Sequence, residues 1–268
     1  MIPARFEYER AESVEHAVEL LGREDAKLLA GGHSLIPLLR LRFARPSLLV
    51  DIGRLEELRY VREDGDRIAI GALSRHCDLA GDPVLTKGAP LVAHVAGEVG
   101  DPQVRHRGTI GGSVSHGDPA SDLGTILLTL DADFVARGPD GERTIPGAEF
   151  FTGPFETALG QQEILTEMRV PKVDGGVYLK HVRRAQDWAT VGVAAARVNG
   201  GVNIGLAGMG ATPLRATAAE QAMAGGASPA DAAAKAADGA EPPSDVSGSA
   251  EYRTHLAQVL TRQALEQL

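Results

Sequence analysis

Two glycine pairs, each followed closely by a hydroxyl residue, are the part of this sequence best suited to chemistry. They lie in the segments AGGHS at residues 30–34 and TIGGS at residues 109–113. Glycine tolerates positive φ and lets a ligand approach the main chain closely. Successive amides that point into one concavity bind anions, phosphates above all. Two such segments predict a pyrophosphate group held between two loops.

The glycine pairs differ from the common nucleotide motifs. Neither has glycines at the first, third and sixth positions of the dinucleotide pattern, and neither has the lysine of a P-loop. A doubly wound nucleotide-binding fold is therefore not indicated. An isolated glycine pair usually marks only a tight turn. The second pair, however, lies within residues 101–122, which are too polar and too rich in glycine and proline for a core element. We therefore expect this run to be a site.

The first glycine pair lies between a predicted strand and a predicted helix. Residues 27–30 form the strand, and residues 34–40 can begin the helix. A strand, a glycine turn and a helix N-terminus together suit a phosphate. Patterns of apolar residues predict further helices at 13–21, capped by Ser13, and at 74–80, 90–97 and 123–130, and strands at 48–52, 67–71, 134–136, 143–145 and 163–170.

The C-terminal part groups its strands before its helices, which indicates an α+β domain. Residues 171–176 mark a boundary, and strands are predicted at 177–182, 190–198 and 202–207. Trp188 is expected to pack in this sheet. Alanine-rich helices follow Pro213, and the last helix is expected to place near one face the residues Tyr252, Leu256, Val259, Leu260 and Gln263.

Composition excludes several functions. The 268 residues carry a formal net charge of −9, which argues against nucleic acid or an anionic membrane as the main partner. A single cysteine, Cys77, allows neither an internal disulfide nor an iron–sulfur cluster within the chain. The charged N-terminus shows no signal segment and no stretch approaches the roughly twenty apolar residues of a membrane span, so we predict a cytoplasmic protein.

Four segments resemble one family, the FAD-binding medium subunit of the molybdenum hydroxylases in the carbon monoxide dehydrogenase and xanthine dehydrogenase group. The segments are LLAGGHSLIPLLRLR at 28–42, RGTIGGSVSHGDPASDL at 107–123, EFFTGP at 149–154 and SGSAEYRTHLAQVLTRQAL at 247–265. The resemblance covers essentially the whole chain in the same order.

The resemblance implies an α+β fold with two domains. Residues 1–171 would form an FAD-binding domain of the vanillyl-alcohol-oxidase (PCMH) type, made of two α+β subdomains at about 1–55 and 56–171. Residues 175–268 would form an α+β domain with a three-stranded antiparallel sheet and helices.

The resemblance also implies a set of cofactor-binding residues: Leu28, Leu29, Ala30, Gly31, Gly32, His33, Ser34, Leu35, Thr109, Gly111, Gly112, Ser113, His116, Asp118, Asp122, Ile164, Leu165 and Lys180. Main-chain amides of both glycine segments would enclose the pyrophosphate, assisted by the hydroxyls of Ser34, Thr109 and Ser113. Leu28 and Leu29 would lie near the adenine or flavin end, and Ile164 and Leu165 near the cofactor's rings.

Two of these residues have competing interpretations. Asp122 would accept a hydrogen bond from a ribityl or ribose hydroxyl, or would cap the helix that follows it. Lys180 would stabilise the anionic reduced flavin ring and raise its potential, or would be an ordinary solvated lysine. His33 and His116 are expected to pack on the cofactor or donate a hydrogen bond. No residue is assigned a catalytic role, and no metal-ligand spacing occurs.

As a function, the resemblance implies an electron-transfer subunit that binds FAD non-covalently. A large molybdopterin subunit and a small iron–sulfur subunit with [2Fe-2S] clusters would supply the electrons, in a dimer of heterotrimers, and the flavin would pass them to an external acceptor. Two alternatives remain at this point: a stand-alone FAD-dependent oxidase or reductase of the same fold, and a non-catalytic nucleotide-binding assembly subunit.

Overall fold

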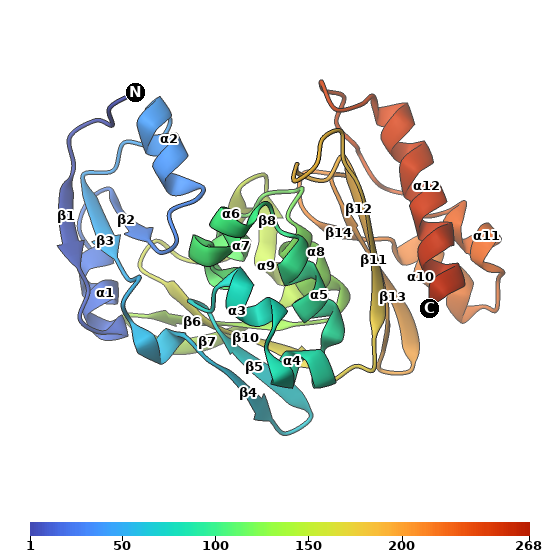
Figure 1. Cartoon of the computed structure of the whole chain (residues 1–268), viewed down its shortest axis with the longest axis horizontal. Coiled ribbons are helices and arrows are strands. Elements are labelled where there is room, and N and C mark those ends of the chain that lie inside the picture. The colour runs from blue at the N-terminus through green and yellow to red at the C-terminus, as the bar shows by residue number, and fades with distance from the viewer.

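The structure, a computed structural model, describes residues 1–268. Three parts follow one another along its long axis, in the order of the chain (Figure 1). The N-terminal part is a small parallel sheet with order β1-β3-β2. Its elements are β1 (Glu7–Arg10), α1 (Val14–Leu21), β2 (Ala26–Leu29), α2 (Leu35–Leu41) and β3 (Leu48–Asp51).

Helix α1 begins where the sequence predicts. The Ser13 hydroxyl accepts a hydrogen bond from the His16 amide at 3.1 Å, which caps the helix. Val14, Ala17 and Leu21 turn their side chains into a core shared with β3. Burial of this apolar stripe attaches the helix to the sheet.

The middle part is a five-stranded antiparallel sheet covered by helices, with strand order β4-β5-β10-β6-β7. The strands are β4 (Val61–Asp64), β5 (Arg67–Gly71), β6 (Asp133–Gly138), β7 (Gly141–Pro146) and β10 (Ile164–Pro171). The helices are α3 (His76–Ala80), α4 (Pro83–Gly88), α5 (Pro90–Glu98), α6 (Pro102–Arg107), α7 (Ile110–Ser115), α8 (Asp122–Thr129) and α9 (Gly147–Phe150). Shorter elements are η1 (Glu56–Leu58), β8 (Phe151–Gly153) and β9 (Glu156–Thr157).

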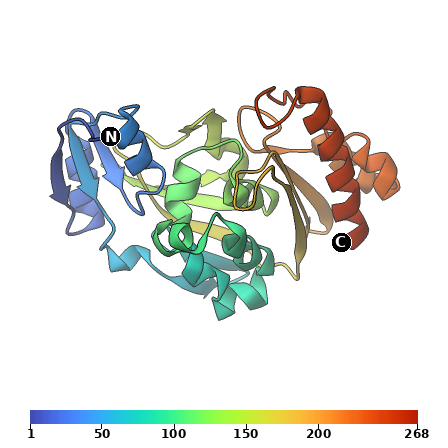
Figure 2. The ribbon, with the colours of Figure 1, turned by 45° about the horizontal axis from the view of Figure 1, so that its top comes forward.

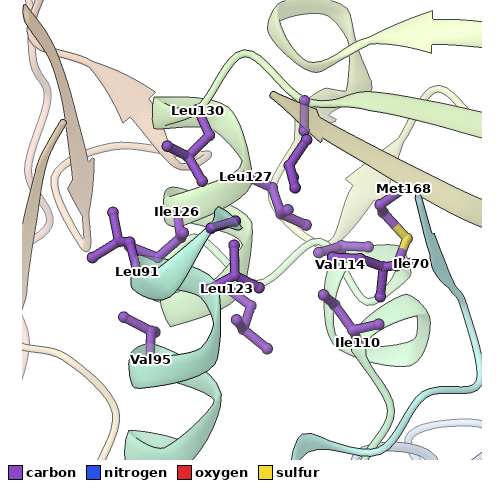
Figure 3. Close-up of a cluster of buried hydrophobic side chains, with 14 of the residues drawn as sticks. Ile70, Leu91, Val95, Ile110, Val114, Leu123, Ile126, Leu127, Leu130 and Met168 are labelled. Carbon is purple, nitrogen blue, oxygen red and sulfur yellow. The ribbon is translucent and has the colours of Figure 1, made fainter. Parts of the chain in front are cut away.

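The largest hydrophobic core lies between this sheet and helices α5, α7 and α8. Figure 3 shows side chains from the three helices and the sheet converging there: Leu91, Val95, Ile110, Val114, Leu123, Ile126, Leu127, Ile70 and Met168. This core fixes α7, whose first turn contains the second glycine pair, and α8, which follows Ser121.

The C-terminal part is an antiparallel sheet with order β11-β12-β13-β14, backed by three helices. The elements are β11 (Gly176–His181), β12 (Val191–Val198), β13 (Gly201–Ala207), β14 (Leu214–Arg215), α10 (Thr217–Ala224), α11 (Pro229–Ala233) and α12 (Ala250–Gln267). The α+β class is confirmed. The sheet has four strands, whereas three were expected. The sequence did not indicate β14, because this strand is only two residues long and shows no alternating pattern.

Helix α8 joins the middle and C-terminal parts. Its residues are almost all buried, because one side packs in the large core and the other against β12 and β13. The Asn203 amide donates to the Thr129 carbonyl at 2.8 Å and to Asp131 at 2.9 Å. Figure 2 shows the C-terminal sheet standing between these central helices and α12.

Three further expectations need correction. Residues 101–122 are partly helical, as α6 and α7, because Asp101 and Thr109 cap these helices with their side chains. Trp188 does not pack in the sheet, since 70% of it is exposed. The buried face of α12 contains Arg253, Leu256, Ala257, Thr261, Ala264 and Leu265, whereas Tyr252 and Gln263 are exposed. No helix of the structure, α12 included, is both long enough and apolar enough to cross a membrane.

Candidate functional site

The first glycine turn connects β2 to α2 and has unused hydrogen-bond donors. Gly32 adopts φ of +80°, where a side chain would be strained. The amides of Gly31, Gly32 and His33 donate no hydrogen bond to any other group of the chain. Ser34 does not cap α2 with its side chain, and both His33 and Ser34 are exposed. This turn can therefore receive an anionic ligand with its main chain.

The second glycine pair is not a turn but the first turn of α7. The amides of Ile110 and Gly111 donate to the carbonyls of residues 74 and 72 at 3.0 and 2.9 Å. Those of Gly112 and Ser113 donate to the hydroxyl and carbonyl of Thr109 at 3.2 and 2.9 Å. The amides of residues 110–113 therefore all have partners within the chain, and the expected contact of this segment with a pyrophosphate stays a prediction.

Glycine is nevertheless required where the two segments meet. A Cβ on Gly31 would overlap the Arg107 carbonyl oxygen and lie 2.8 Å from its carbonyl carbon. The first turn thus lies directly against the residues that lead into Thr109. Figure 1 shows the loop between β2 and α2 reaching toward α6 and α7. Gly112, in contrast, is exposed, and a Cβ there would be close only to the Thr109 hydroxyl, at 2.8 Å.

Asp122 lies at the start of α8 and joins two residues of β11. Its Oδ1 accepts a hydrogen bond from the Tyr178 hydroxyl at 2.5 Å, and its Oδ2 pairs with Lys180 Nζ at 2.8 Å. The Asp122 and Lys180 side chains are only 10% and 13% exposed. Burial and the Asp122 carboxylate raise the pKa of Tyr178 well above its ordinary value, so the hydroxyl stays protonated.

These contacts exclude two of the interpretations left open by the sequence: Asp122 as a helix cap and Lys180 as a solvated lysine. The helix cap is Ser121, whose hydroxyl accepts from the Gly124 amide at 3.1 Å, so Asp122 is not the cap. Lys180 is largely buried in an ion pair and is not a solvated lysine. Sequence reasoning missed Ser121 and Tyr178. Strand alternation was the available signal for Tyr178, since residues 178 and 180 share one face of β11.

Three of the other predicted residues, Leu28, Ile164 and Leu165, belong to the hydrophobic cores or pack against them. Leu28 packs against a core that contains Ile164, whereas Leu165 belongs to the larger core. Because Ile164 and Leu165 are 1% and 4% exposed, a ligand near them would meet mainly backbone.

Loop residues that follow α7 complete the predicted set. His116 is half-buried, with its ring centroid 5.1 Å from that of Phe155, and burial lowers its pKa. Asp118 accepts from the Ala120 amide at 2.9 Å, which stabilises the loop before α8.

The arrangement suits binding of a phosphate-bearing cofactor more than catalysis by side chains. The first turn carries free amides, Gly112 is exposed without a side chain, and a buried carboxylate is held at the start of α8. These features fit FAD, which carries two phosphates and many hydroxyls. No group of three or more His, Cys, Asp or Glu side chains could hold a metal ion.

Comparison with known proteins gives the same result. Residues 4–173 match the family described as FAD binding domain in molybdopterin dehydrogenase. Residues 177–268 match the CO dehydrogenase flavoprotein C-terminal domain. The carbon monoxide dehydrogenase medium chain of Hydrogenophaga pseudoflava is 42% identical over 99% of this chain and 97% of its own length. The glyceraldehyde dehydrogenase medium chain of Sulfolobus acidocaldarius is 38% identical over the full length of both.

Solved structures extend the comparison to the fold. Carbon monoxide dehydrogenase from Hydrogenophaga pseudoflava, in a form lacking the Mo-pyranopterin moiety of its cofactor, superposes with a TM-score of 0.94 at 45% identity, over 99% of this chain and 98% of that one. Quinoline 2-oxidoreductase from Pseudomonas putida also gives 0.94, at 28% identity, over 100% and 98%. The chain therefore belongs to the family of FAD-binding medium subunits of the molybdenum hydroxylases, which are oxidoreductase complexes.

Proposed function

We propose that the first glycine turn holds the pyrophosphate of non-covalently bound FAD, with α7 forming the opposite wall. The unused amides of Gly31, Gly32 and His33 carry this proposal, because they are donors that the chain itself leaves unpaired. We expect the Ser113 hydroxyl, which forms no hydrogen bond within the chain, to donate to the pyrophosphate. Gly112 has no side chain that would keep the cofactor away from α7. The remaining predicted contacts are Leu28 to Leu35, Thr109, Gly111, His116, Asp118, Ile164 and Leu165.

Asp122 and Lys180 position the redox end of the cofactor in this proposal. Their charges balance each other at 2.8 Å, so Lys180 acts as a hydrogen-bond donor of fixed orientation more than as a free cation. This revises its expected effect on the flavin potential, since a neutralised pair stabilises an anion less than an isolated cation does. Bound FAD supplies reversible electron uptake and release, and this chain supplies binding and orientation.

The partners of the chain follow from its relatives. These are medium chains of dehydrogenases, which supports a subunit function over a stand-alone oxidase or reductase. We infer a small subunit with [2Fe-2S] clusters and a large subunit with the molybdenum cofactor, assembled as a dimer of heterotrimers in the cytoplasm. Electrons would pass from those subunits through the flavin to an external acceptor.

We also propose domains at residues 1–171 and 175–268, with the first divided near residue 55. Three hydrophobic cores support this division in part, since one lies wholly within residues 191–265. The largest core also takes in Tyr178, Ala194, Ala196 and Val198 of the C-terminal sheet, and the N-terminal core takes in Leu73 and Ile164. Residues 172–174 are too short for a mobile linker.

An absorption spectrum tests the proposal directly. The full chain, purified after FAD is supplied, should show flavin absorbance in stoichiometric amount. An iron–sulfur chain and a molybdenum chain should co-purify from the native source. A chain without flavin absorbance would contradict the binding proposal, whereas flavin without partner chains would contradict only the subunit assignment.

A further inference from the structure

The segment SGSAEYRTHL at residues 247–256 contains a buried arginine that is not among the predicted cofactor-binding residues. Arg253 lies in the first turn of α12 and is only 3% exposed. Its Nη2 donates to both carboxylate oxygens of Asp245 at 2.8 Å. Desolvating a guanidinium group is costly, and an apolar side chain could fill the same space without that cost. Packing alone therefore does not explain an arginine at this position.

The other terminal nitrogen of Arg253 joins the ends of two strands. Nη1 donates to the carbonyl of Thr190, directly before β12, and to the carbonyl of Gly208 at 3.3 Å, directly after β13. Gly208 adopts φ of +72°, and a Cβ there would lie 2.6 Å from the Thr190 carbonyl oxygen. The two main-chain segments thus pack directly on each other, and one guanidinium group donates to both.

Both strand ends connect to the ion pair between Asp122 and Lys180. The amide of residue 190 donates at 2.9 Å to the carbonyl of His181, the residue after Lys180. The amide of residue 208 donates at 2.9 Å to the carbonyl of Pro119, three residues before Asp122. Helix α12 packs on one face of the C-terminal sheet and α8 on the other (Figure 2). Arg253 therefore reaches the segments beside both members of the pair from the opposite side of the sheet.

We propose that Arg253 is a positioning residue that fixes the geometry of the Asp122–Lys180 pair. Its planar guanidinium group presents donors in fixed directions, and here they serve Asp245 and the carbonyls of Thr190 and Gly208 at once. The connection to the ion pair does not depend on FAD. Its consequence for the cofactor rests on the proposed function, in which this pair orients the redox end.

The reactivity of Lys180 in the full chain without FAD tests the connection. The chain is acetylated with acetic anhydride, and peptide mass spectrometry follows each lysine, with the exposed Lys235 as internal reference. Lys180 should react about threefold faster or more in Arg253→Met, because the buried pair opens more often once its support is lost. The matched control, Arg262→Met, breaks an exposed ion pair on the same helix and should leave the Lys180 rate unchanged.

Asp245→Asn is a milder variant, because it keeps the guanidinium group and removes the half-exposed carboxylate that orients it. It should change the Lys180 rate in the same direction by a smaller factor. Far-ultraviolet circular dichroism identifies the folded variants, and Asp245→Asn decides the question if Arg253→Met does not fold. An unchanged Lys180 rate in the folded variant would overturn the proposal.

The affinity for FAD, measured by fluorescence titration, tests the consequence for the cofactor. Arg253→Met should weaken binding by about three- to tenfold, as expected when one hydrogen bond to the cofactor is misplaced. The same substitution should have no further effect in a chain that already carries Asp122→Asn and Lys180→Met. An equal loss in that chain would overturn the proposal, because Arg253 would then act independently of the pair. A wild-type chain that never binds FAD would contradict the proposed function, and the acetylation rates would still decide the role of Arg253.

Discussion

Replacing Asp122 by alanine should destabilise the protein strongly, because this carboxylate joins α8 to the C-terminal sheet. It accepts hydrogen bonds from Tyr178 and Lys180 at 2.5 and 2.8 Å, and neither charged side chain is more than 13% exposed. Removing one member of a buried ion pair leaves the other charge unpaired and costs about 3–5 kcal/mol. Lys180 and the Tyr178 hydroxyl would both lose their partner.

The variants Tyr178→Phe and Lys180→Met divide this effect. Tyr178→Phe removes a neutral donor and should cost about 1–2 kcal/mol, because Asp122 keeps its ion pair. Lys180→Met leaves the Asp122 carboxylate with the Tyr178 hydroxyl alone. A double-mutant cycle between Asp122→Ala and Lys180→Met should give a coupling energy of about 1–3 kcal/mol, as expected for residues in one network.

Urea unfolding at neutral pH measures these free energies. Glu266→Ala is the matched control, because it breaks an ion pair of 2.8 Å with Arg262 in which both side chains are about half exposed. Such surface pairs contribute about 0.3–0.5 kcal/mol. If Asp122→Ala were no more destabilising than Glu266→Ala, the buried network would not stabilise the joint between the domains.

Three other predictions address the glycine segments and a buried histidine. Gly31→Ala should lose FAD binding, since its Cβ would overlap the Arg107 carbonyl. Gly97→Ala should keep it, because the nearest atom to its Cβ is 3.6 Å away. Equal flavin content in both variants would contradict the packing of the first glycine turn against the residues that lead into Thr109. Gly112→Val should lower FAD affinity, because its branched side chain would cover the bare glycine surface and press on the Thr109 hydroxyl. Unchanged affinity, measured by fluorescence titration, would remove Gly112 from the binding surface. Burial lowers the pKa of His76 to about 4 from 6.5, so the unfolded chain binds the extra proton first and stability should fall by up to about 3 kcal/mol as pH drops through this window. Urea unfolding of His76→Gln should show a flatter profile, and parallel profiles would refute this assignment.

Local patterns predicted much of the fold correctly. Strand β5 has the predicted bounds, and the Ser13 cap and the turn at Asn199 and Gly200 have the expected chemistry, with φ of 52° and 81° at the turn. These features depend on residues near one another in the chain. The two-residue strand β14 and the exposure of Trp188 depend on distant packing, so no local pattern could indicate them.

The candidate site was predictable to the extent that it consists of consecutive residues. The first glycine turn has the conformation that its sequence indicates. The second does not, because Ala72 and Ser74, more than thirty residues away, accept its amide hydrogen bonds. Likewise, Asp122 and Tyr178 are 56 residues apart and meet only after α8 packs on the C-terminal sheet.

The flavin content of the reconstituted full chain tests the central assignment most directly. After incubation with FAD and removal of the unbound excess, one FAD per chain should remain, and Gly31→Ala should retain none while staying folded by circular dichroism. A wild-type chain without flavin, or a Gly31→Ala variant that retains it fully, would contradict the placement of FAD at the first glycine turn.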